Sequence, residues 1–119
     1  MTRLFKRSHI CLVAACFLLA GCHSAFVDAR VVNHSGAAVR LVEMDYPNAS
    51  FGTSDLPNGS TFKYRFKILG SGPTKLSWTD AHEKEESSSG PPLHPGQEGS
   101  LSVTLQPDGT ADWNTGLNQ

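Results

Sequence analysis

Acid and imidazole side chains are the first candidates for chemistry in this chain, because they can carry protons or hold metal ions. Four histidines fall in separate predicted loops, without the paired spacing of metal sites: His23, His34, His82 and His94. The tightest group is His82 with Asp80 and Glu83. A metal ion there would need three or more converging ligands, so we interpret the group as a solvated turn and predict no metal site.

The sequence contains no recognisable motif for nucleophilic or acid-base catalysis. A serine nucleophile needs a base and an orienting group, and the chain has no Gly-x-Ser-x-Gly motif. Gly70-Ser71-Gly72 is typical of a turn. Alternation places Glu83 and Glu85 on one exposed edge, without the apolar surroundings that acid catalysis uses. We therefore predict that the protein is not an enzyme, with no catalytic residue and no cofactor.

A stripe of cations is the one candidate for ligand binding. Lys63, Arg65 and Lys67 alternate along a predicted strand, which places three cations on one face at intervals of about 6.5 to 7 Å. Such a face could meet anionic headgroups, glycans or an acidic partner. The alternative is that the stripe is simply the solvated side of a strand.

Aromatic side chains could instead form a sugar-stacking platform. A domain without disulfides needs most of its aromatic residues for its core, so we expect core packing for most of them. Trp113, near the C-terminus, is the one expected to be partly exposed.

A basic segment followed by an apolar run opens the chain. Arg3, Lys6 and Arg7 lie within residues 1–8, which contain no acid, and residues 10–20 are an unbroken apolar run of 11. A helix needs roughly 20 residues to cross a bilayer, so this layout predicts a cleaved signal peptide rather than a permanent span.

The residues that close this run carry a family resemblance. Leu19-Ala20-Gly21-Cys22 resembles the lipobox of bacterial lipoproteins, over residues 1–22. The resemblance implies cleavage between Gly21 and Cys22 and a diacylglyceryl group on the Cys22 sulfur, usually with a third acyl chain on the amine. The alternative is ordinary cleavage a few residues later, for instance after Ser24, although Leu19 is bulky for an ordinary site before Cys22.

The same resemblance predicts a location and a first partner. The acylated Cys22 would hold the protein on a lipid bilayer. Because His23 follows the cysteine where an Asp would often signal inner-membrane retention, the outer membrane, facing the periplasm, is favoured over the inner membrane.

Composition limits the part of the chain that begins at Cys22. Removing residues 1–21 from the 119-residue chain leaves 98, enough for one small domain. All 11 acids stay but only seven of the ten Lys and Arg, a net charge of −4 that disfavours nucleic-acid binding. Cys22 is the last of three cysteines, so no disulfide is expected.

Alternating apolar residues and turn residues predict strands over residues 26–33, 38–46, 61–69, 75–79, 84–88, 101–105 and 110–114. In the strand over 61–69 the residues expected to face the core are Phe62, Tyr64, Phe66 and Ile68. In 38–46 the apolar parity changes, which predicts a bulge near Leu41-Val42 or burial of both faces. Residues 47–60 and 87–99 are predicted loops, with Phe51, Leu56 and Leu93 as anchors into the core.

These elements predict an all-β fold: a single small antiparallel β-sandwich of about seven strands, immunoglobulin-like, after an N-terminal signal helix. The expected organisation is a signal peptide at 1–21, a lipidated tether at 22–25, the sandwich at 26–114 and a disordered tail at 115–119. The predicted function is that of a non-enzymatic envelope protein. Its domain would act at the membrane surface as an interaction or structural module for an envelope protein partner. The alternative is a module that binds a glycan or small ligand.

Overall fold

The computed structural model describes residues 24–119, so the predicted signal peptide, its cleavage site at Gly21-Cys22 and the acylation site Cys22 lie outside the described residues. Residues 24–119 form eight strands and no helix. Accordingly, no helix in this part of the chain is long and apolar enough to cross a membrane.

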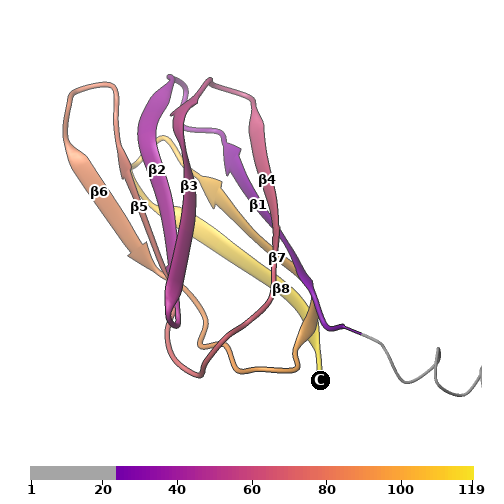
Figure 1. Cartoon of the computed structure of the whole chain (residues 1–119). Helices are drawn as coiled ribbons and strands as arrows, with labels where there is room; N and C mark the ends of the chain where they lie inside the picture. Colours follow the sequence, from indigo (N-terminus) through magenta and orange to yellow (C-terminus); the bar gives the residue numbers. More distant parts are fainter. Residues whose placement is uncertain (1–23) are drawn as a thin grey trace, which may run out of the picture.

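The strands form two four-stranded sheets that pack face to face (Figure 1). Sheet A has, in order, β4 (Thr61–Phe66), β1 (Val27–Asn33), β7 (Glu98–Leu105) and β8 (Ala111–Asn118). Sheet B has β3 (Ala49–Leu56), β2 (Val39–Tyr46), β5 (Lys75–Thr79) and β6 (Glu85–Ser89). The predicted all-β, two-layer fold is confirmed. The described strands number eight rather than about seven, and β1 pairs with β7 in parallel, so the sandwich is not wholly antiparallel.

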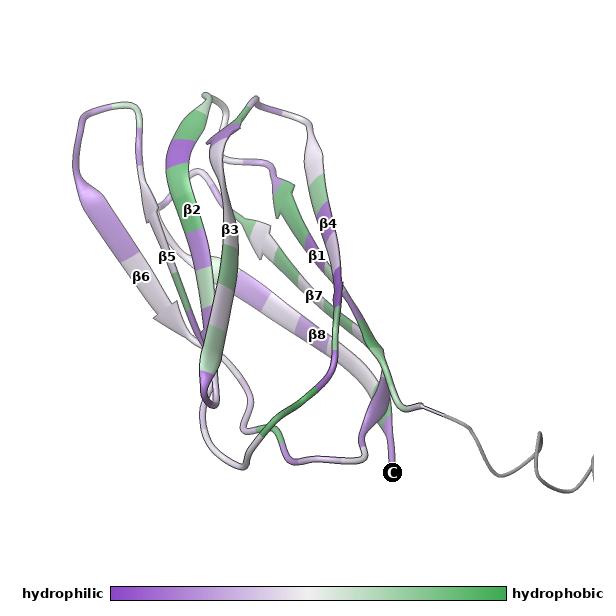
Figure 2. Ribbon diagram, in the orientation of Figure 1, coloured by the Kyte–Doolittle hydropathy of each residue, from purple (hydrophilic) through white to green (hydrophobic). Residues whose placement is uncertain are grey.

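The core lies between the sheets and follows the alternation in the sequence. In β1 and β7 the buried residues face each other across the parallel register, with Ala29 opposite Leu101 and Val31 opposite Val103. Leu76 and Trp78 of β5, both buried, supply the opposite layer. Figure 2 shows this alternation as apolar and polar bands along β1 and β7. The strands predicted over 26–33, 75–79 and 101–105 are therefore confirmed, each within a few residues.

A bulge in β2 accounts for the change of parity. Val39 and Val42 are both buried although they are three residues apart, and the pairing of β2 with β5 shifts between Arg40 and Glu43. Leu41 lies in this shift with a φ of 51° and a 63% exposed side chain. One extra residue lets both valines reach the core, so of the two predicted alternatives the bulge is correct.

The predicted loop over 47–60 is wrong, because residues 49–56 form the edge strand β3. Pro47 and Asn48 form a two-residue turn, in which Asn48 has a φ of 70°. This turn connects β2 to β3, and the two strands pair in antiparallel. Phe51 and Leu56 are buried as predicted, but as strand residues. A Cβ on Gly52 would overlap the carbonyl oxygen of Val42, so this position must be glycine, a residue that makes the segment look like a loop.

The predicted core face of β4 is only half correct. The strand ends at Phe66, and Phe66 and Ile68 are buried, but Phe62 is half-buried and Tyr64 is 44% exposed. Since β4 is an edge strand, these rings meet the edge strand of the other sheet: Tyr64 stacks on Phe51 with ring centroids 4.4 Å apart. An aromatic cluster therefore closes this side of the sandwich.

The predicted disordered tail over 115–119 is corrected by β8, which continues to Asn118. Asn118 pairs with Glu98, and β7 accordingly begins before the end of the predicted loop over 87–99. Trp113 of β8 is partly buried, as expected, and its Nε1 donates to Ser88 Oγ of β6 at 2.9 Å. This hydrogen bond links the two sheets on the side opposite the aromatic cluster.

Asn33, the last residue of β1, has no exposed surface. Its Nδ2 donates to the carbonyl oxygens of Ala37 at 2.8 Å and of Leu56 at 3.0 Å. Its Oδ1 accepts hydrogen bonds from the backbone N–H of Ser35 at 3.0 Å and from the Ser35 hydroxyl at 2.6 Å. One amide side chain thus joins sheet A to the end of β3 in sheet B and shapes the turn before β2.

Replacing Asn33 with Ala should lower the free energy of unfolding by about 2 to 4 kcal/mol, since it leaves buried carbonyl oxygens without donors. Asn58→Ala is the matched control. Asn58 Oδ1 accepts one exposed hydrogen bond, from Gly36 N–H at 3.0 Å, and its loss should cost less than about 1 kcal/mol. Urea unfolding followed by tryptophan fluorescence measures both values, and equal losses would contradict the role given to Asn33.

Candidate functional site

The two ends of the sandwich carry different loops, and one of them also carries both ends of the described chain. β1 and β7 run parallel and β4 and β8 run against them, so the start of β1 and the C-terminus lie at one end, the lower end in Figure 1. We name this the proximal end. It also carries the Pro47-Asn48 turn and the loops over residues 67–74 and 90–97. The distal end carries the β1–β2, β3–β4, β5–β6 and β7–β8 loops.

The predicted cation stripe is present in part. Lys63 and Arg65 lie exposed on the outer face of β4, while Lys67 follows the strand and is also exposed. The register places Arg30 of β1 beside Lys63, so a fourth cation joins them. We name Arg30, Lys63, Arg65 and Lys67 the basic patch. Sequence reasoning missed Arg30 as a member of the patch because only the β1–β4 pairing brings it there, although alternation alone places it on the polar face of its strand.

The neighbours of Arg65 define the proximal part of the patch. Arg65 Nε lies 3.9 Å from Asp28 Oδ1, and both side chains are more than two-thirds exposed, so this pair contributes little to stability. The Arg65 guanidinium also lies 4.7 Å from the centre of the Phe26 ring. Phe26 thereby shares the outer face of sheet A with the patch.

Charge is distributed unevenly over the described residues. Residues 24–119 contain seven Lys and Arg and 11 Asp and Glu. The segments 24–33 and 61–70 hold four of these cations and a single acid, Asp28. The remaining segments hold three cations and ten acids. An acidic domain therefore has one basic side, along β1 and β4.

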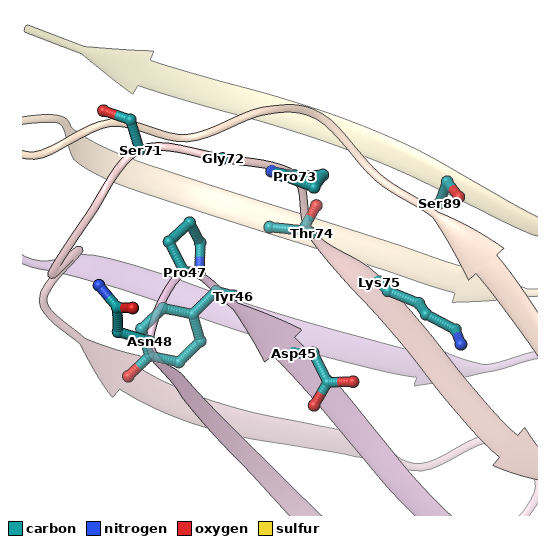
Figure 3. Close-up of a pocket in the computed structure, with 10 residues that line it drawn as sticks. All are labelled: Asp45, Tyr46, Pro47, Asn48, Ser71, Gly72, Pro73, Thr74, Lys75 and Ser89. Atoms are coloured by element: carbon teal, nitrogen blue, oxygen red, sulfur yellow. The ribbon is translucent and has the colours of Figure 1, made fainter.

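A cavity of about 510 Å³ opens at the proximal end, between the Pro47-Asn48 turn and the loop before β5. Figure 3 shows its lining, which combines proline rings, a tyrosine ring, hydroxyl groups and one charge of each sign: Asp45, Tyr46, Pro47, Asn48, Ser71, Gly72, Pro73, Thr74, Lys75 and Ser89. Burial, with a smaller contribution from Tyr64, raises the pKa of Tyr46, so its hydroxyl stays protonated at neutral pH. Such a lining suits a small polar ligand with an apolar side.

Sequence reasoning did not find this cavity, because its walls come from loops that are far apart in the chain. A glycine signal was present but could not be interpreted without the fold. A Cβ on Gly70 would come within 2.6 Å of Asn48 Nδ2, so a larger residue there would displace the Asn48 side chain from its place beside the cavity.

The side chains of Asp80, His82 and Glu83 at the distal end do not converge on one point. Asp80 Oδ1 accepts hydrogen bonds from the backbone N–H groups of His82 at 2.8 Å and Lys84 at 3.0 Å, and the bond from Lys84 is the main cause that lowers the pKa of Asp80. Glu83 forms an ion pair with Arg40. Among residues 24–119, no group of three or more His, Cys, Asp or Glu side chains is placed to hold a metal ion.

The other candidates for chemistry are dispersed. His34 lies in the β1–β2 turn, and His94 lies at the proximal end, where its Nε2 is 2.9 Å from Gln119 Oε1. His23 lies outside the described residues. Ser71 lines the proximal cavity while His82 lies at the distal end, so the structure separates this serine from that histidine.

Two further carboxyl groups, Glu43 and Asp108, have pKa values that the folded state shifts in opposite directions. A hydrogen bond with the Asp45 side chain, and then the charge of Asp45, raise the pKa of Glu43 on the outer face of sheet B. In the β7–β8 turn, hydrogen bonds from the hydroxyl and then the N–H of Thr110 lower the pKa of Asp108 below 3.8. A lowered pKa stabilises the fold above the unfolded value, and this stabilisation is lost as the pH falls through the folded value.

Thr110→Val removes the hydroxyl donor and should raise the pKa of Asp108 toward 3.8, so that less stabilisation is lost below that pH. Thr110→Ser keeps the hydroxyl and should leave the titration unchanged. Carboxyl chemical shifts in an NMR titration measure the pKa directly. An unchanged Asp108 titration in Thr110→Val would contradict the assigned cause.

The basic patch thus runs along β1 and β4 to the proximal end, where the chain enters its first strand and where the cavity also lies. Comparison with protein-family models, with curated proteins and with solved structures found no match to this chain. The geometry of its own residues is therefore the basis for inferring a function.

Proposed function

We propose that the chain is a lipid-anchored protein of the bacterial envelope whose β-sandwich acts, without catalysis, as an interaction or structural module at the membrane surface. The observation that carries the proposal is the position of β1, which begins at Val27. Only residues 23–26 separate Val27 from the lipobox cysteine, so their Cα atoms are at most about 18 Å apart. An acylated Cys22 would hold the proximal end next to a bilayer.

The anchor accounts for membrane attachment without a spanning segment. Each buried methylene contributes about 0.8 kcal/mol, and two or three acyl chains together hold a protein permanently. His23 after the cysteine favours the outer membrane, facing the periplasm. The distal loops and the outer face of sheet B would then point toward soluble partners.

The domain resembles immunoglobulin-like sandwiches in architecture, as two packed sheets with loops gathered at both ends. Its strand order differs from that of immunoglobulin domains. In immunoglobulin domains the first two strands pair within one sheet, whereas here β1 and β2 lie in different sheets and β1 is central in sheet A. The shared property that matters for the proposal is a rigid scaffold that presents loops.

Replacing Cys22 with Ser should abolish lipid modification and release the protein from the membrane fraction, because the diacylglyceryl group is carried by the Cys22 sulfur. Cys16→Ser is the matched control, since this cysteine lies within the signal peptide and should not affect anchoring. Cell fractionation and detergent phase separation measure the outcome. A Cys22→Ser protein that is processed normally and stays in the detergent phase would refute the anchor.

A second candidate function is the binding of an envelope glycan or another small polar ligand. The proximal cavity favours it, because about 510 Å³ is within the size range of small-molecule sites and its lining offers hydrogen-bonding groups beside proline and tyrosine rings. Lys75 lies on the cavity wall, so its replacement should weaken the binding of such a ligand.

Crosslinking and ligand titration separate the two candidates. An interaction module should yield one dominant envelope protein when a photoreactive residue replaces His82 in cells, and its thermal midpoint should not change with a panel of envelope glycans. A glycan-induced shift that Lys75→Gln abolishes and Lys84→Gln preserves would favour the cavity instead. Lys84 is a matched control because it lies at the distal end.

A further inference from the structure

We propose that the basic patch on β1 and β4, with the exposed side chains of Phe26 and Leu69, docks on the anionic headgroups of the bilayer that holds the anchor. This inference rests on the proposed lipid anchor and adds an orientation to it. The domain would lie on its β1–β4 side, with sheet B turned away from the membrane.

Charge complementarity is the first argument. The β1–β4 side concentrates four of the seven cations of residues 24–119, although the domain as a whole is acidic. On the outer face of sheet B, β2 instead presents Glu43 and Asp45, which an anionic surface would repel. A bilayer with negative headgroups therefore distinguishes the two faces and favours contact through sheet A.

Exposed apolar side chains form the second argument. Among the described residues, two of the four exposed large hydrophobic side chains adjoin the basic patch: Phe26 at 38% and Leu69 at 58%. Phe26 and Leu69 lie at the proximal end, one just before β1 and the other just after β4. Apolar rings and chains beside cations are typical of surfaces that enter the headgroup region of a bilayer.

Reach is the third argument. Attraction between exposed cations and headgroups falls off within a Debye length, about 8 Å at physiological ionic strength. A freely diffusing acidic domain would seldom stay that close. A linker of four residues before Val27 keeps Phe26, Arg65 and Lys67 near the surface, so a modest patch is sufficient to set the orientation.

The test uses the acylated protein reconstituted into vesicles of phosphatidylcholine alone or mixed with anionic phosphatidylglycerol. With Cys22 acylated, a cysteine introduced by Leu69→Cys carries the only fluorescent label, and Ser87→Cys labels the exposed polar strand β6 of sheet B as the control. Nitroxide lipids quench labels that approach the headgroups. We expect quenching at position 69 to be about twofold stronger in anionic than in neutral vesicles, with little quenching at position 87 in either.

Charge reversal identifies the patch as the cause. Lys63→Glu with Lys67→Glu should abolish the difference between anionic and neutral vesicles at position 69. Lys75→Glu with Lys84→Glu, the same change in net charge on exposed lysines of sheet B and its loop, should preserve it. Circular dichroism of both double variants confirms that they remain folded.

Two results would overturn the orientation. These are equal quenching at positions 69 and 87, or equal effects of the two charge reversals. Vesicle flotation is measured first and tests the anchor separately. If the protein floats with vesicles but its labels at positions 69 and 87 are quenched equally, this inference is refuted while the lipid anchor stands.

Discussion

The burial of one amide side chain is the constraint on which the arrangement of the sheets depends. Asn33 ends β1 in sheet A, yet its hydrogen bonds end on Leu56 of sheet B and on the turn that leads into β2. A buried amide without partners is costly, so the two sheets can separate at this end only by breaking the whole network. The Asn33 backbone adds a further link at this end, since the Gly59 N–H of the β3–β4 loop donates to the Asn33 carbonyl oxygen at 2.7 Å.

Residues 24–119 contain no cysteine for a disulfide, so side-chain contacts close the two open sides of the sandwich. On one side the edge strands β3 and β4 meet through stacked aromatic rings, chiefly Phe51 on Tyr64. On the other side Trp113 reaches from β8 to Ser88 of β6. Aromatic rings suit both places because they bury a large area while leaving one edge in contact with water.

The same fold gathers the basic patch and the cavity along β1 and β4 and at the proximal end. Pairing of β1 with β4 puts Arg30 beside Lys63, and it places the start of the domain next to that basic patch. The Pro47-Asn48 turn and the loop before β5 form a cavity at the same end. A short link to an acylated cysteine would place all of these features within reach of headgroups, and it would leave the distal loops for a partner.

Local pattern determined much of this protein. The alternation of Val27, Ala29 and Val31 predicted a half-buried strand, because side-chain direction in a strand has a period of two. The change of parity around Leu41 predicted either a bulge or burial of both faces, and the structure decided for the bulge. The edge strand β3 and the end of the edge strand β8 did not show this pattern: β3 contains Gly52 and the end of β8 contains Gly116, and both segments are strands because a neighbouring strand supplies hydrogen bonds. The Asn33 network, the contribution of Arg30 to the basic patch and the proximal cavity were decided by tertiary structure alone, since each joins residues whose proximity depends on pairings distant in the chain.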